Sequence, residues 1–103
     1  MSKKEQLENL AAFIGLRAAH EILIKMTNKQ ESVVHLGQEA DTYSDLSFEL
    51  SQGNWNDADI QRMKDLAKKR CKKKLGKYGD IGEEKYDGVE RVIENIMHDL
   101  ELG

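Results

Sequence analysis

The stretch Leu10–Met26 reads LAAFIGLRAAHEILIKM, and it is the only long segment of the chain that is apolar almost all the way round. On a wheel of 100° per residue, most of its apolar side chains gather on one broad side of a helix. Phe13 and Ile24 fall on the other side, beside Arg17. We therefore expect a central helix that other parts of the fold cover on two sides.

The composition around this segment favours a single all-α domain that spans residues 1–103. Charged residues make up 34% of the chain and hydrophobic residues 39%, and the chain contains no proline and only 6% aromatic residues. These values are typical of amphipathic helices and disfavour a β-sandwich or barrel. A chain of 103 residues has room for one hydrophobic core.

Capping residues and loop residues divide the chain into about four helices. The first helix should begin near Ser2, which forms a capping-box pattern with Glu5, and end near Asn28. A second helix is expected from Asn28 to Leu50, although Gly37 and the strand-like SVVHL segment (residues 32–36) weaken its helical pattern.

The segment SQGNWN, residues 51–56, predicts a loop in which Trp55 closes the end of the bundle. Asn56 should cap the third helix, which is expected to end at Gly76 or Gly79. The predicted buried positions of the third helix are Ile60, Met63, Ala67, Cys71 and Leu75 or Tyr78.

A second capping-box pattern, Asp80 with Glu83, predicts the start of the fourth helix. Its apolar stripe is expected to contain Tyr86, Val89, Ile93, Ile96, Met97 and Leu100. Short linkers between four amphipathic helices favour an antiparallel bundle. Because the first helix has apolar residues on both sides, we expect a homodimer or higher homo-oligomer to complete the bundle. The predicted subunit interface contains Leu10, Phe13, Arg17 and Ile24.

The third helix ends in the basic run KKRCKKKLGK, residues 68–77, which holds seven basic and no acidic residues. The net charge of −3 therefore hides a charge of about −10 on the rest of the chain. Cations near a helix C-terminus gain about 0.3 to 1 kcal/mol, but each like-charge i,i+4 pair costs about 0.2 to 0.5 kcal/mol. Helix stability alone therefore does not explain seven cations.

Two interpretations of the basic run remain open: cations that are solvated or neutralised by acidic faces of the protein, and cations that bind the phosphates of nucleic acid or another polyanion. The candidate phosphate-binding residues are Lys68, Lys69, Arg70, Lys72, Lys73 and Lys77. Lys69, Lys72 and Lys73 are expected to make direct contacts, because they project away from the buried seam, and Arg70 and Lys77 are expected at the edge of the contact. The following Gly76 to Gly79 segment resembles a phosphate-binding GxxG loop only superficially, and turn chemistry is an adequate reason for its glycines.

Metal and catalytic chemistry have little support in the sequence. His35 with Glu39, and Glu94 with His98, are i,i+4 pairs, but the second pair should face water and the first lies at the edge of its helix stripe. His20 is expected to be a polar group at the surface or an interface. No hydrolase triad, nucleotide-binding loop or HExxH helix occurs, so we predict no catalytic residue, no metal and no cofactor.

A single cysteine, the absence of a secretory signal pattern and the charges within residues 10–26 favour a cytoplasmic protein that does not enter a membrane. The expected function is that of a small non-enzymatic accessory or regulatory protein that binds nucleic acid or another polyanion. One alternative is a protein-interaction module whose basic helix contacts an acidic protein. A second is a metal-dependent hydrolase in a helical bundle.

Overall fold

The computed structural model describes residues 2–26, 42–43, 45–77 and 83–102. The named elements are α1 (Lys3–Met26), α3 (Asp57–Leu75), the short 3-10 helix η1 (Glu83–Tyr86) and α4 (Val89–Asp99). Residues 45–51 are also helical, and no strand occurs within the described residues. The all-α class is therefore confirmed. Residues 27–41, the first part of the expected second helix, lie outside the described residues.

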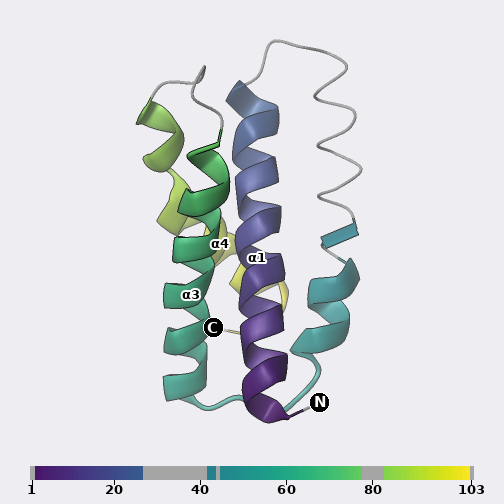
Figure 1. The fold of residues 1–103 in the computed structure, drawn as a ribbon. Helices are drawn as coiled ribbons and strands as arrows, with labels where there is room; N and C mark the ends of the chain where they lie inside the picture. The colour runs from purple at the N-terminus through teal and green to yellow at the C-terminus, as the bar shows by residue number, and fades with distance from the viewer. Residues whose placement is uncertain (1, 27–41, 44, 78–82, 103) are drawn as a thin grey trace.

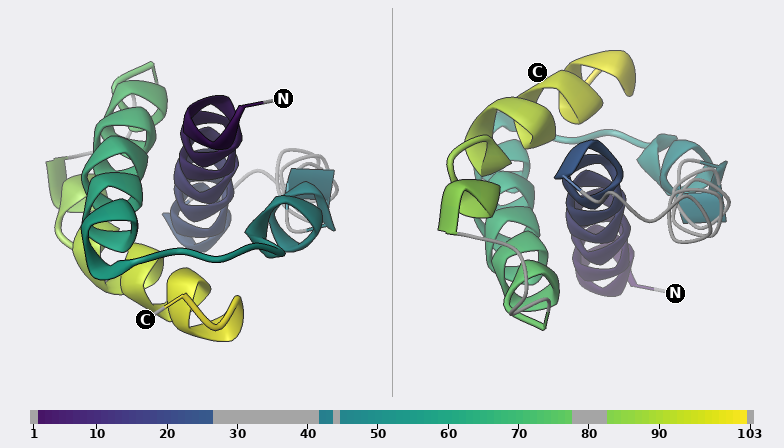
Figure 2. Two further views of the ribbon diagram at one scale, coloured as in Figure 1. Left: turned by 90° about the horizontal axis from the view of Figure 1, so that it is seen from below. Right: turned by 90° about the horizontal axis from the view of Figure 1, so that it is seen from above.

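Helix α1 is the central element (Figure 1). In the two end views α3 lies on one side of α1, the helical segment 45–51 lies on the other, and α4 crosses behind the α1–α3 pair (Figure 2). Leu10, Ile14 and Leu23 are fully buried, and the Phe13 ring stacks on Tyr43 with 6.0 Å between ring centroids. The apolar character of α1 on both sides thus reflects helical neighbours on both sides.

The closest neighbour of α1 is α3, and the two helices run in the same direction (Figure 1). Lys3 Nζ lies 3.1 Å from Asp59 Oδ2 near the two N-termini, and one turn or more further along Arg62 Nη2 lies 4.0 Å from Glu8 Oε1. The antiparallel arrangement expected from the sequence does not describe this pair. The reason is topological: Gln6 Nε2 donates to the Leu50 carbonyl and Lys3 Nζ lies 5.6 Å from the centroid of the Trp55 ring, so the segment before α3 lies beside the start of α1.

Gly15 permits the close approach of α1 and α3. A Cβ atom built on Gly15 would lie 2.6 Å from the Ala67 carbonyl oxygen and 2.8 Å from Arg70 Cβ. Any side chain at this position would push the two helices apart, because real Cβ atoms do not approach other atoms so closely. The absence of a side chain at Gly15 therefore sets the α1–α3 distance.

The predicted helix caps are present at α1 and α3. The Glu5 backbone N–H donates to Ser2 Oγ over 3.1 Å, as the expected cap at Ser2 requires. Asn56 and Asp59 form a reciprocal capping box, in which each side chain accepts a hydrogen bond from the other residue's backbone N–H. Helix α3 ends at Leu75 with Gly76 as its C-cap, one of the two predicted stops.

The predicted start of the fourth helix is wrong. Residues Glu83–Tyr86 form the 3-10 helix η1, and α4 begins only at Val89. The Asp87 N–H donates to the Glu84 carbonyl over 3.0 Å, which closes a tight turn, and Gly88 has non-helical dihedral angles of −97° and 3°. Glycine has a low helix propensity, so the chain bends at Gly88 before the apolar stripe begins. Asp80 lies outside the described residues.

The predicted core positions of α3 and α4 are confirmed where the structure describes them. In α3 these are Met63, Ala67, Cys71 and Leu75, all fully buried, with Ile60 packed at the edge of the core. In α4 and the turn after it, Val89, Ile93, Ile96, Met97 and Leu100 are buried.

Trp55 packs against the end of this core, in the position expected of a lid. Its indole Nε1–H donates to the Ser51 carbonyl over 3.1 Å, and Lys3 Nζ lies 5.6 Å from the ring centroid. The tryptophan thus joins the loop after residue 51 to the start of α1 and its polar atom is satisfied.

Candidate functional site

The cations of α3 divide between two sides of the helix. On the side that faces α4, Lys64 pairs with Glu94, and Lys68 Nζ lies 3.0 Å from Glu90 Oε1. The hydrogen bond from Lys68 lowers the pKa of Glu90, and the hydrogen bond to Glu94 raises the pKa of Lys64. These two lysines therefore join α3 to α4. Only Lys68 belongs to the basic run of residues 68–77, and its pairing is of the kind that the self-neutralising interpretation expects.

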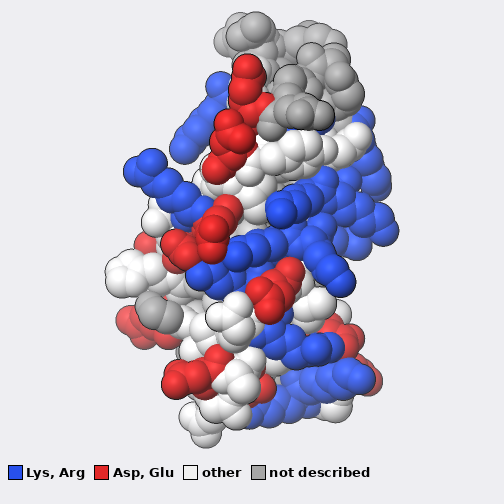
Figure 3. All heavy atoms as spheres, turned by 90° about the vertical axis from the view of Figure 1, so that its left-hand side faces the viewer, with Lys and Arg blue, Asp and Glu red and all other residues white. Residues whose placement is uncertain are grey.

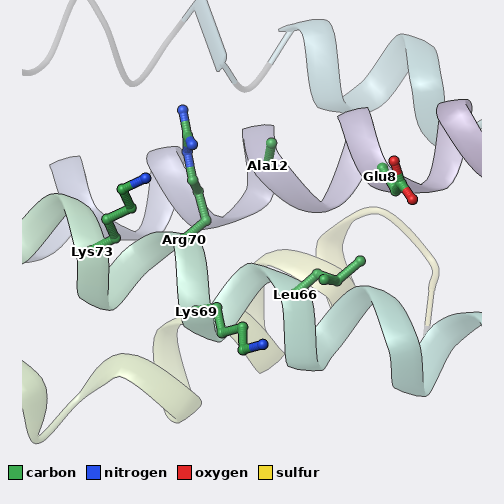
Figure 4. A pocket seen from close by; sticks show the side chains of 6 residues that line it. All are labelled: Glu8, Ala12, Leu66, Lys69, Arg70 and Lys73. Carbon is green, nitrogen blue, oxygen red and sulfur yellow. The ribbon is translucent and has the colours of Figure 1, made fainter.

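On the side that faces α1, Lys69, Arg70 and Lys73 line a groove of about 310 Å³. Its other lining residues are Leu66 on α3 and Glu8 and Ala12 on α1. In the close-up view Arg70 and Lys73 extend from α3 toward α1, while Lys69 stays on the outer side of α3 (Figure 4). The groove thus has small apolar residues between its helices and cations along one edge.

We call Lys69, Arg70, Lys73 and Lys77 the α3 basic face. All four side chains are exposed. Within the part of the chain that the structure describes, no carboxylate forms an ion pair with any of them. A space-filling view shows Lys and Arg side chains crowded together on this flank of the molecule, with acidic side chains at their border (Figure 3). The face therefore carries four positive charges that the described residues leave open to a ligand.

The structure regroups the six candidate phosphate-binding residues. Lys68 forms an ion pair with Glu90. Lys72 is exposed and does not line the groove, and its charge contributes to the lowered pKa of Glu90. Arg70, expected at the edge, lies in the groove itself. The sequence contained one signal for this division, the i,i+4 pair Glu90 and Glu94, but not the information that this pair faces α3.

The predicted subunit-interface residues have contacts within the chain. Leu10 is fully buried in the core, so in this structure a second subunit has no access to it. Phe13 stacks on Tyr43, Ile24 packs against the core, and Arg17 is partly exposed. The two-sided apolar character of α1 is thus accounted for largely inside one chain.

His20 differs from its expected position at the surface, because it is fully buried. Its Nδ1 lies 2.7 Å from the Leu16 carbonyl oxygen, and its ring centroid lies 5.3 Å from that of Tyr43. His98 and Glu94 are exposed as expected. In the described residues no three His, Cys, Asp or Glu side chains come together in a way that could hold a metal ion. The pair His35 and Glu39 lies outside those residues.

Among the described residues, no helix is long and apolar enough to cross a membrane. The chain matches no known protein-family model, and comparisons with curated proteins and with solved structures found no match.

Proposed function

We propose that this protein is a small non-enzymatic accessory or regulatory protein that binds the phosphate backbone of nucleic acid through the α3 basic face. One observation carries the proposal. Lys64 and Lys68 on α3 have carboxylate partners on α4, while the four cations of the basic face have none among the described residues. The fold thus pairs two lysines of α3 with α4 and leaves the basic face available to a ligand.

The spacing of the basic face suits a row of phosphates. From Lys69 to Leu75 α3 rises about 9 Å at 1.5 Å per helical residue, and Lys77 follows in the turn after the helix. One strand of duplex DNA presents a phosphate about every 3.4 Å along its axis. Four cations over this length can therefore reach about four phosphates. Their mutual repulsion, which costs about 0.2 to 0.5 kcal/mol for each i,i+4 pair, is relieved when phosphates lie between them.

A second candidate function is the binding of an acidic protein segment by the same face. The observation in its favour is the apolar part of the groove, formed by Ala12 and Leu66. A phosphate backbone has no apolar group to place there, whereas an acidic amphipathic peptide does. Both functions depend on the same cations, so substitutions of these cations would weaken either one. A direct measurement of binding to nucleic acid distinguishes the two functions.

The test compares two triple variants of α3 that remove the same charge from opposite sides of the helix. The groove variant is Lys69→Gln, Arg70→Gln, Lys73→Gln, and the control variant is Lys64→Gln, Lys68→Gln, Lys72→Gln. Glutamine has nearly the helix propensity of lysine and arginine, so both variants should keep the wild-type circular dichroism spectrum.

Binding is measured by fluorescence anisotropy with a labelled DNA duplex at low salt. We expect the groove variant to bind more than about tenfold more weakly than wild type, because three phosphate contacts are lost. The control variant should stay within about threefold of wild type, because its cations face α4. Equal losses of affinity in both variants would show that DNA is attracted by the overall charge of α3 and not by the basic face. A wild-type protein that binds neither DNA nor RNA would refute the proposal and favour the binding of an acidic peptide.

Self-association and a cytoplasmic location belong to the same proposal. The single cysteine supports a reducing compartment, because no intrachain disulfide is available to a chain with one thiol. Support for self-association comes from Phe48, which is 62% exposed on the helical segment 45–51, and from its neighbour Leu46, which is 36% exposed.

A further inference from the structure

A second cavity, separate from the α3 groove, lies between the C-terminal half of α1, η1 and the start of α4. Its volume is about 360 Å³. The lining residues are Ile22, Lys25, Met26, Glu84, Lys85, Gly88, Arg91, Val92 and Asn95. None of them belongs to α3. Figure 2 shows α4 passing beside this end of α1.

Three cations line this cavity, each from a different element. Lys25 comes from the last turn of α1, Lys85 from η1 and Arg91 from the first turns of α4, while Glu84 is the only carboxylate among the described residues of the lining. Lys85 is only 5% exposed, an unusual degree of burial for a lysine. Lys25 and Arg91 form no ion pair with any described carboxylate. Among the described residues, these two cations therefore have no carboxylate partner at the cavity and are available to an anion.

The remaining lining separates into an apolar part and a polar end. Ile22, Met26 and Val92 supply apolar side chains. Gly88 caps α4 without a side-chain hydrogen bond, and a Cβ atom built on it would meet nothing within 4 Å, so the space beside the α4 N-terminus is open. The positive end of the α4 dipole adds to the field of the cations there.

We propose that this cavity binds a small organic anion, namely a phosphate monoester with an apolar body. Arg91 and Lys25 bind the phosphate oxygens, with Arg91 able to form two parallel hydrogen bonds. The apolar body packs on Ile22, Met26 and Val92. The volume lies within the range of about 300 to 1,000 Å³ that is usual for small-ligand pockets. This site is independent of the α3 basic face and goes beyond the proposed function.

Isothermal titration calorimetry with phenyl phosphate and with inorganic phosphate tests the proposal on the full chain. We expect phenyl phosphate to bind at least about tenfold more tightly than inorganic phosphate, because only the former buries an apolar group. The double variant Lys25→Gln, Arg91→Gln should reduce phenyl phosphate affinity by more than about tenfold. The matched control is Arg70→Gln, Lys73→Gln, which removes the same residue types from the α3 basic face and should retain wild-type affinity.

Four results would overturn the proposal, provided that circular dichroism shows each variant folded. Wild-type protein without measurable phenyl phosphate binding would exclude the site. A loss of affinity in the Arg70 and Lys73 variant alone would place the anion on α3 instead. Equal losses of phenyl phosphate affinity in both double variants would show a general attraction between charges and no specific site. Equal affinity for phenyl phosphate and inorganic phosphate would lead to the same conclusion.

Discussion

At the scale of single residues, Cys71 combines full burial with a suppressed acidity. Desolvation raises the pKa of the thiol to about 12. Because the thiolate is the reactive form, the native protein at neutral pH should not react with a thiol reagent such as a disulfide dye. We expect one thiol per chain to be labelled only after denaturant is added. Rapid labelling of the native chain would show that α3 opens or that its seam is wrongly assigned.

Gly15 supplies the second prediction for single residues. The substitution Gly15→Ala gains up to about 1 kcal/mol in helix propensity, but the new methyl group must lie 2.6 Å from the Ala67 carbonyl oxygen unless the helices move. Overpacking of this kind costs about 1 to 3 kcal/mol, so we expect a net loss in the free energy of unfolding.

Urea denaturation measures the effect of Gly15→Ala. Gly53→Ala is its control, because a Cβ atom at Gly53 would meet the Trp55 ring only at an ordinary van der Waals distance of 3.6 Å and Gly53 caps no helix that the structure describes, so the free energy of unfolding should change by no more than about 0.5 kcal/mol. A Gly15→Ala protein as stable as wild type would mean that α1 and α3 do not approach as closely as the structure places them.

The sequence pattern predicts the burial of some residues and not of others. The position of Cys71 in a stripe of apolar residues at helical spacing was enough to predict its burial. The role of Gly15 and the burial of His20 could not be predicted in this way, because both depend on which helix covers each side of α1. Periodicity identifies the sides of a helix but not their neighbours.

At the scale of elements, the ion pairs that join the helices predict how stability depends on pH. The hydrogen bond from Lys3 lowers the pKa of Asp59, and that from Lys68 lowers the pKa of Glu90. A carboxyl group with a lowered pKa stabilises the fold fully above its usual pKa and loses this contribution as the pH falls through the lowered value. Stability should therefore fall when the pH drops below the usual values of 3.8 for Asp59 and 4.5 for Glu90.

Urea midpoints between about pH 3 and about pH 6 measure this dependence. We expect Glu90→Gln to flatten the acid side of the profile, since glutamine does not titrate. Glu101→Gln is a suitable control, because Glu101 is exposed and forms no ion pair with any described residue. Identical profiles for wild type and Glu90→Gln would show that the α3–α4 ion pair contributes nothing to folding.

The helices themselves were largely predictable from sequence, and their mutual arrangement was not. Capping residues located the start of α1 and of α3, and apolar stripes located the buried sides of α3 and α4. The capping-box pattern of Asp80 and Glu83 does not predict the start of α4, because the chain bends at Gly88 and α4 begins only at Val89. The division of the basic run required knowledge that Glu90 and Glu94 face α3, which only the packed structure supplies.

At the scale of the whole molecule, self-association remains a prediction that sedimentation can test. We expect a dimer or higher oligomer at tens of micromolar protein, a range set by interface affinities of about micromolar or better. Phe48→Gln should shift the distribution toward monomer, because it removes the most exposed large apolar side chain of the described residues. Sedimentation as monomer alone would count against self-association without affecting the account of the α3 basic face.

The net charge of −3 on the whole protein opposes the binding of a polyanion, so binding must depend on the local basic face. Salt therefore distinguishes a defined set of phosphate contacts from a diffuse attraction. Each phosphate contact on duplex DNA contributes about 0.9 to the slope of log affinity against log salt concentration. Four contacts predict a slope of magnitude about 3.6 for wild type.

The measurement that tests the central claim most directly is this salt titration, carried out on wild type and on the Lys69→Gln, Arg70→Gln, Lys73→Gln variant. Because three of the four phosphate contacts are removed, the magnitude of the salt slope should fall by about 2.7 in the variant, to about 0.9, while the fold is unchanged. A wild-type protein that does not bind duplex DNA at low salt, or a variant whose slope equals that of wild type, would contradict the assignment of the α3 basic face as a phosphate-binding surface.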